Sequence, residues 1–178
     1  MKPETMQTRV AFLRGINVGG NTMVSMKELA ALCTHMGLAD VQTYLNSGNV
    51  VFRSPLPEAE LQKALEVELS GKTGKEIRVV IRSAGDLEQI AEDNPFPEAV
   101  PSHVGVLLGT APVPENILSE FSTPGREKIV AGKREVYIHY PDGIGRSKLK
   151  IPPLLREGTM RNINTISGLV LLIAQSRK

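Results

Sequence analysis

Two polar clusters in the chain contain residue types that bind anions. The first lies in a loop with three glycines between residues 15 and 20 and in the stretch "YLNSGNVV", and its members are Arg14, Asn17, Ser47 and Asn49. Guanidinium, amide and hydroxyl groups, helped by glycine backbone amides, are the donors that hold phosphate and similar groups. The structural alternative is that Asn and Gly are also common in tight turns, because they tolerate positive φ and bond nearby backbone.

The second cluster combines "PDGIGRSKLK" (141–150) with "TMRNINT" (159–165). From Arg146 to Arg161 the chain has five basic residues and one acidic residue, Glu157. Arg146, Lys148 and Arg161 are suited to an anion, and Asn162 or Thr165 at a helix start would add dipole support. The alternative is a solvated basic loop followed by an ordinary helix cap. The complete predicted ligand-binding set is Arg14, Asn17, Ser47, Asn49, Lys148, Arg161, Asn162 and Asn164.

Several familiar kinds of site are absent from the sequence. No Gly-Lys-Ser/Thr follows the glycines, which excludes a P-loop, and their spacing does not fit a dinucleotide fingerprint. The three histidines lie far apart, so we predict no metal site and no cofactor. No nucleophile with a matched base is recognisable. The stretch "SGNVVFRS" lacks the stacking aromatics of an RNA-recognition sheet.

Composition sets the broad class of the protein. The 178 residues are 41% hydrophobic and 22% charged, as expected for a globular protein. A net charge of +2 and only seven aromatic residues argue against nucleic acid as a partner. The single Cys33 predicts a small core residue rather than a disulfide. A polar N-terminus and short apolar runs predict a cytoplasmic protein without membrane association.

The first half of the chain has the element order of a ferredoxin-like sandwich, β-α-β-β-α-β. Residues 8–13 predict a strand, Ser25 and Glu28 the capping box of the next helix, and Gly37 its left-handed end. Ser47-Gly48 predicts a two-residue hairpin loop. A helix from "PEAELQKALEVEL" and a strand "EIRVVIR", with Arg82 pointing outward, complete the pattern.

A proline-rich stretch, 93–102, separates this half from a second one that starts the pattern again. We expect a strand "HVGVLLG", a helical "PENILSEF", a hairpin "EKIVAGKREVYIHY" and a helix around 163–175. The predicted fold is therefore α+β, with two ferredoxin-like subdomains related by internal duplication. The predicted domains are 1–92, which includes a short helix "SAGDLEQIAE", and 103–178, with 93–102 as the connector.

The quoted motifs together resemble a bacterial family known as domain of unknown function 1697. The matching segments are "LRGINVGG", "SGNVVF", "NPF", "YIHYPDGIGRSKL" and T-x-R-N-x-N-T, in order from residue 13 to 165. The resemblance implies a duplicated fold of two ferredoxin-like subdomains and supplies no activity. Members of the family often carry Lys at the positions of Asn21 and Met23, Pro at that of Ser25, and Trp at that of Ile163.

Three functional hypotheses follow from these observations. The first is a protein that binds a small anionic or nucleotide-like ligand at the cluster of the glycine loop and hairpin tip. The second is an enzyme of unknown reaction at the same cluster, and the third is an interaction module in which the motifs are structural. Loops carry function more often than cores, which favours the first two. The lack of a recognisable acid–base pair favours binding over catalysis.

Overall fold

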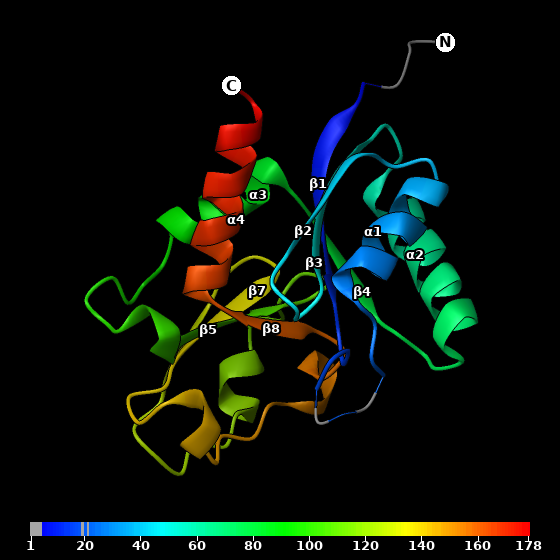
Figure 1. The fold of residues 1–178 in the computed structure, drawn as a ribbon. Coiled ribbons are helices and arrows are strands. Elements are labelled where there is room, and N and C mark those ends of the chain that lie inside the picture. The colour runs from blue at the N-terminus through cyan, green and yellow to red at the C-terminus, as the bar shows by residue number, and fades with distance from the viewer. Residues whose placement is uncertain (1–4, 19, 21) are drawn as a thin grey trace. The chain divides into compact units, whose positions relative to one another are not determined.

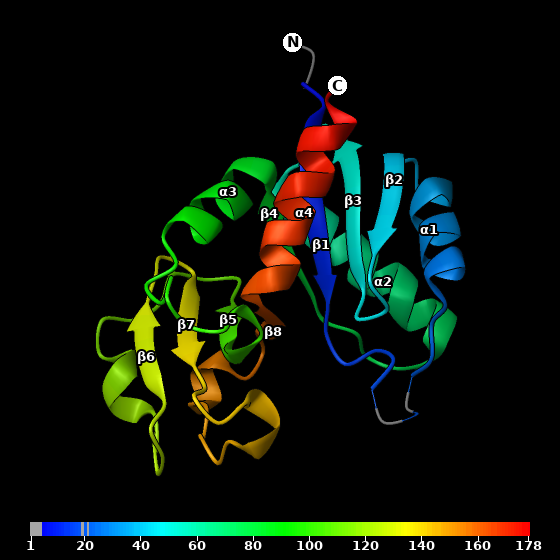
Figure 2. The same cartoon turned by 60° about the vertical axis from the view of Figure 1, so that its left-hand side comes forward.

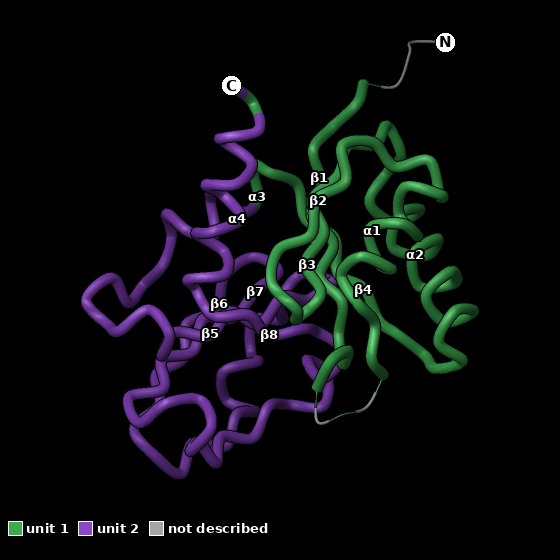
Figure 3. Tube along the Cα trace, viewed as in Figure 1, with its two compact units in different colours: residues 1–86, 177 green, residues 87–176, 178 purple. Residues whose placement is uncertain are grey.

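The computed structural model describes residues 5–18, 20 and 22–178, so Gly19 and Asn21 of the glycine loop lie outside the described residues. The chain divides into two compact units, residues 1–86 and residues 87–176, with the last two residues shared between them (Figure 3). Each unit contains one four-stranded antiparallel sheet. The fold is α+β with two similar ferredoxin-like subdomains, which confirms the fold predicted from sequence.

The first unit has the predicted β-α-β-β-α-β order (Figure 1). Its elements are β1 (Gln7–Leu13), α1 (Met26–His35), β2 (Ala39–Tyr44), β3 (Asn49–Ser54), α2 (Glu58–Thr73) and β4 (Val79–Ser83). The sheet order is β2-β3-β1-β4, and every neighbouring pair is antiparallel. Both helices pack on one face of this sheet, where their leucines share a core with β1, β3 and β4.

Local sequence signals place the ends of α1 as predicted. Ser25 accepts a hydrogen bond from the Glu28 backbone N–H at 3.0 Å, and the Glu28 carboxylate accepts from the Ser25 N–H at 3.2 Å. This reciprocal capping box satisfies two N–H groups that the helix cannot pair itself. After the helix, Gly37 has a φ of +87°, and Cys33 is fully buried in the core. Both observations agree with the sequence.

Two details of the first sheet differ from prediction. The β2–β3 loop contains four residues, Leu45–Gly48, because Leu45 already leaves the strand with a φ of +60°. The two-residue hairpin loop is therefore wrong, although Gly48 does adopt positive φ, at +88°. Arg82 was expected to point into solvent and is only 1% exposed. Both faces of β4 are buried, so its alternation of apolar and charged residues does not separate core from solvent.

The second unit repeats the sheet with different connections (Figure 2). Its helices and strands are α3 (Ala84–Glu92), which begins in the first unit, β5 (Val104–Leu108), β6 (Lys128–Ala131), β7 (Glu135–His139), β8 (Thr159–Asn162) and α4 (Ile163–Ser176). The order β6-β7-β5-β8 places β5 and β7 inside the sheet, as β1 and β3 are in the first. This shared order supports the duplication.

The crossover connections of the second unit are not α-helical. The helix expected for "PENILSEF" is only a 3₁₀ turn at Ile117–Glu120, and Ser122 then pairs with Lys150 in an isolated bridge. Pro112 and Pro114 precede this turn and Pro124 follows it, and proline does not continue an α-helix. Between β7 and β8 the chain forms further 3₁₀ turns, Ile144–Arg146 and Pro153–Leu155. The segment "TMRNINT", for which no strand was predicted, begins with the edge strand β8.

The connector 93–102 lies inside the second compact unit, beyond the division at residue 86. Its role as the boundary between independently folding domains stays a prediction. Within the described residues, no helix combines the length and the hydropathy that a membrane span requires.

Candidate functional site

The glycine loop and the hairpin tip lie side by side at one end of the first sheet, because β1 and β2 run in the same direction. Asn17 joins them. Its amide nitrogen donates to the carbonyl oxygens of Val24, at 2.9 Å, and Asn46, at 2.7 Å, while its oxygen accepts from the Val24 N–H at 2.9 Å. Both amide protons are thus committed to backbone, and Asn17 holds the loop in a left-handed conformation with φ +55°.

Asn49 has a similar role inside the hairpin. Its side chain is fully buried, and its amide donates to the Tyr44 carbonyl at 2.7 Å and to the Ser47 hydroxyl oxygen at 3.0 Å. A buried amide with both protons bonded is a structural element that closes the four-residue loop. In this cluster Arg14 and Ser47 are the exposed members of the predicted set. Their assignment to a ligand stays a prediction.

The predicted ligand-binding residues near the C-terminus, Arg161, Asn162 and Asn164, do not lie together in one loop. Arg161 is 8% exposed, and its guanidinium donates to the Thr159 hydroxyl at 2.8 Å and the Met160 carbonyl at 3.0 Å. Burial lowers the pKa of Arg161 to about 10, which still leaves it charged at neutral pH. Asn162 accepts from the Thr165 N–H at 3.0 Å and so acts as the N-cap of α4, while Asn164 is exposed.

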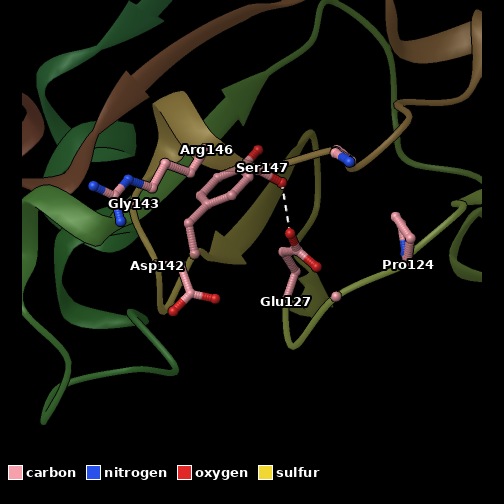
Figure 4. A pocket seen from close by; sticks show the side chains of 9 residues that line it. Pro124, Glu127, Asp142, Gly143, Arg146 and Ser147 are labelled. Atoms are coloured by element: carbon pink, nitrogen blue, oxygen red, sulfur yellow. Dashed lines mark hydrogen bonds between the residues drawn. The ribbon is translucent and has the colours of Figure 1, made fainter.

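A pocket in the second unit contains the remaining member, Lys148. It lies between the segment before β6 and the segment after β7, the two crossover connections that are helical in the first unit. We call it the crossover pocket. Its volume is about 150 Å³, and its lining consists of Pro124, Gly125, Glu127, Tyr140, Asp142, Gly143, Arg146, Ser147 and Lys148 (Figure 4).

Tyr140 forms part of the pocket wall. Its ring belongs to the core of the second unit, together with Leu107, Val136 and Ile138, and the residue is only 4% exposed. Its hydroxyl makes no hydrogen bond to any residue that the structure describes. Burial, and then the charge of Glu127, raise the pKa of Tyr140 to about 12, so the hydroxyl keeps its proton at neutral pH. The wall therefore holds a protonated hydroxyl that can donate to whatever occupies the pocket.

Two cations line the same pocket. Arg146 and Lys148 are exposed, and neither forms an ion pair within the described part of the chain. Figure 4 shows the Arg146 side chain extending past Gly143, away from Ser147 and Glu127, whereas Glu127 reaches toward Ser147. The pocket thus presents positive charge from one short segment, the 3₁₀ turn and the residues after it.

Each carboxylate of the pocket has one bonded oxygen, whereas the buried Oε2 of Glu127 has no hydrogen-bond partner among the described residues. Glu127 accepts from the Ser147 hydroxyl at 2.6 Å, and Asp142 accepts from Arg126 at 2.5 Å. The Ser147 hydroxyl, followed by the backbone N–H groups of Glu127 and Gly125, holds the pKa of Glu127 below its usual value of 4.5. Glu127 is therefore ionised at neutral pH. The carboxylates of the pocket are thus partly engaged, and the two cations have no carboxylate partner among the described residues.

Sequence reasoning identified only one side of this pocket. The basic segment 141–150 was singled out by composition, but Tyr140 carries no local signal because its ring is an ordinary core residue. Glu127 and Gly125 come from a segment whose approach depends on the crossover connection being non-helical. The prolines that break this connection are the signal that would have indicated it.

Comparisons with known proteins support the fold and leave the activity open. A family model described as "Protein of unknown function (DUF1697)" matches residues 6–137. The solved structure of the conserved bacterial protein SP0830 from Streptococcus pneumoniae is similar, with a TM-score of 0.75 and 23% sequence identity. The similarity covers 94% of this chain and 98% of that one. Among curated proteins, none matches.

Proposed function

We propose that this chain, which belongs to the family described as "Protein of unknown function (DUF1697)", binds a small anionic ligand in the crossover pocket. One observation carries the proposal: the Tyr140 side chain is buried except at its hydroxyl, which bonds to no described residue and opens to the pocket that Lys148 also lines. Buried tyrosine hydroxyls normally find an acceptor. A ligand in the pocket can supply this acceptor.

Charge favours an anion as that acceptor. Lys148 and Arg146 have no carboxylate partner within the part of the chain that the structure describes, and one oxygen of each pocket carboxylate is bonded to another side chain, whereas Oε2 of Glu127 is not. Like charges that line one cavity repel each other, even in water. An anion between them removes this repulsion and gains charge-assisted hydrogen bonds.

The glycine loop and hairpin tip offer fewer donors to a ligand. The amide protons of Asn17 and Asn49 are bonded within the cluster. Arg14 and Ser47 remain as exposed side chains there. We therefore place the ligand in the crossover pocket and assign the loop–hairpin cluster to holding the first unit together.

Thermal unfolding in the presence of inorganic phosphate tests the proposal. A ligand that binds only the folded state raises the melting temperature as its concentration exceeds Kd. We expect phosphate to raise it more than chloride at equal ionic strength, with an effect that weakens as salt is added. In the Lys148→Ala variant the shift should be lost.

Lys150 provides the matched control. It is exposed, lies two residues along the chain, and is not part of the pocket lining. Lys150→Ala should keep the phosphate shift, because it removes the same charge without removing a pocket donor. An equal loss in both variants would show that phosphate acts on net charge alone, and the proposal would then be wrong.

A further inference from the structure

We infer that the ligand of the crossover pocket is a phosphate ester whose organic part carries hydroxyl groups, such as a phosphorylated polyol. This inference rests on the proposed anion binding and adds the chemical class of the ligand. The donors of the pocket select the phosphoryl group, and a free carboxylate oxygen of Asp142 selects the hydroxyl.

The donors come from three side chains at different positions around the cavity: the Tyr140 hydroxyl, the Lys148 ammonium and the Arg146 guanidinium. A carboxylate has two oxygens, whereas a phosphate monoester presents three terminal oxygens in a tetrahedral arrangement. Three separate donors therefore suit a phosphoryl group better than a planar carboxylate. Arg and Lys are also the side chains that most often bind phosphate.

Asp142 supplies the second element of recognition. Its Oδ1 accepts from Arg126, and its Oδ2 has no partner among the described residues. Asp142 lines the pocket, and Figure 4 shows its carboxylate apart from the Glu127–Ser147 pair. An acceptor at the edge of an anion site repels a bare second anion and favours a ligand that brings a hydrogen-bond donor.

That donor is a hydroxyl rather than an ammonium group. The charge of Asp142 is balanced by Arg126, whose Nη2 lies 2.5 Å from Oδ1. An ammonium group beside Asp142 would gain little net attraction and would meet the positive charge of Arg126. A neutral hydroxyl can donate to the free Oδ2 without either effect. The cavity volume of about 150 Å³ leaves room for a short carbon chain beyond the phosphoryl group.

Two matched probes test the inference. Propyl phosphate and glycerol 3-phosphate have the same number of carbon atoms and the same phosphoryl group, and they differ only in hydroxyls. We expect calorimetric titration of the full chain to give a Kd about fivefold lower for glycerol 3-phosphate, the contribution of roughly one net hydrogen bond. In Asp142→Ala this preference should disappear while propyl phosphate binds as tightly as before, or more tightly.

Arg126→Ala controls for the lost ion pair. It breaks the same exposed pair but leaves the carboxylate, so it should keep the preference for glycerol 3-phosphate. Equal affinities of the two probes for the wild-type chain would overturn the inference while leaving anion binding in place. A preference that survives in Asp142→Ala would equally overturn it. If neither the two esters nor inorganic phosphate binds, the proposed function itself fails.

Discussion

The side-chain amide of Asn17 donates a hydrogen bond to the backbone carbonyl of Asn46 at 2.7 Å, across 29 positions of sequence. This contact ties the glycine loop to the hairpin tip. It depends on the topology, because the loop after β1 and the tip between β2 and β3 meet only where β1 and β2 run in the same direction. The residue that resembles a ligand-binding asparagine is thus a structural clamp.

Loss of this clamp should destabilise the fold. In Asn17→Ala three hydrogen bonds disappear, and two carbonyl oxygens and the N–H of Val24 lose their partner. We expect a decrease of about 1–3 kcal/mol in the free energy of unfolding, measured by urea denaturation. Arg14→Ala, an exposed change in the same loop, should stay within about 0.5 kcal/mol. Equal effects in the two variants would contradict the clamp.

Gly48 should be less tolerant of a side chain than Gly15. Both have positive φ, at +88° and +73°, so Ala at either position carries a conformational cost of about 1–2 kcal/mol. A Cβ on Gly15 meets nothing within 4 Å, whereas one on Gly48 would lie 2.7 Å from Ile16 Cδ1 and 3.0 Å from Leu13 Cβ. Gly48→Ala should therefore cost about 1–3 kcal/mol more in unfolding experiments. Identical costs would show that φ alone matters.

Short-range signals predicted the helix ends correctly. The capping box of Ser25 and Glu28 and the left-handed Gly37 depend on residues within one or two turns, so sequence alone contains the information. The two-residue hairpin loop was wrong because the backbone of Leu45 turns away from the strand, which no residue type there indicates. The prediction that Arg82 points into solvent was wrong, because the burial of a side chain depends on what covers each face of the sheet.

The candidate site could be predicted only in part, because some of its features depend on contacts between residues far apart in sequence. The segment 141–150 could be singled out because its charges are adjacent in sequence. Two features of the pocket are visible only in the folded chain. The Tyr140 hydroxyl has no acceptor among the described residues, and Glu127 bonds to Ser147 across 20 positions. Arg161 appeared to be part of a basic loop, because the four-residue strand β8 is too short to show an alternating pattern.

The Ser147–Glu127 hydrogen bond should be visible in the acid titration of Glu127. The folded-state pKa lies below 4.5, so the stabilising contribution is complete above that pH and is lost as pH falls through the folded-state value. Ser147→Ala removes the largest cause of the lowering, and the pKa should move up toward 4.5. Carboxyl NMR of Glu127 in both proteins measures this directly. An unchanged pKa in Ser147→Ala would argue against the bond.

The prediction that 93–102 separates two domains can be tested on a fragment. The core that α1 and α2 form with the first sheet draws its residues from positions 11 to 81, all within residues 1–92. We expect residues 1–92 to unfold cooperatively on heating, as followed by circular dichroism. A control fragment, 1–75, lacks β4 and so one neighbour of the central strand β1, and should not. A non-cooperative transition in 1–92 would make the two halves a single folding unit.

The most direct test of anion binding is to remove one oxygen atom from the pocket. Tyr140→Phe keeps the ring in the core and deletes only the hydroxyl that has no partner among the described residues. Tyr137→Phe is the control, because that hydroxyl donates to the Ile90 carbonyl at 2.9 Å and is not part of the pocket lining. Calorimetric titration with inorganic phosphate should give a Kd about five- to tenfold higher for Tyr140→Phe and unchanged for Tyr137→Phe. Phosphate affinity that is the same in Tyr140→Phe as in the wild-type chain would contradict the account.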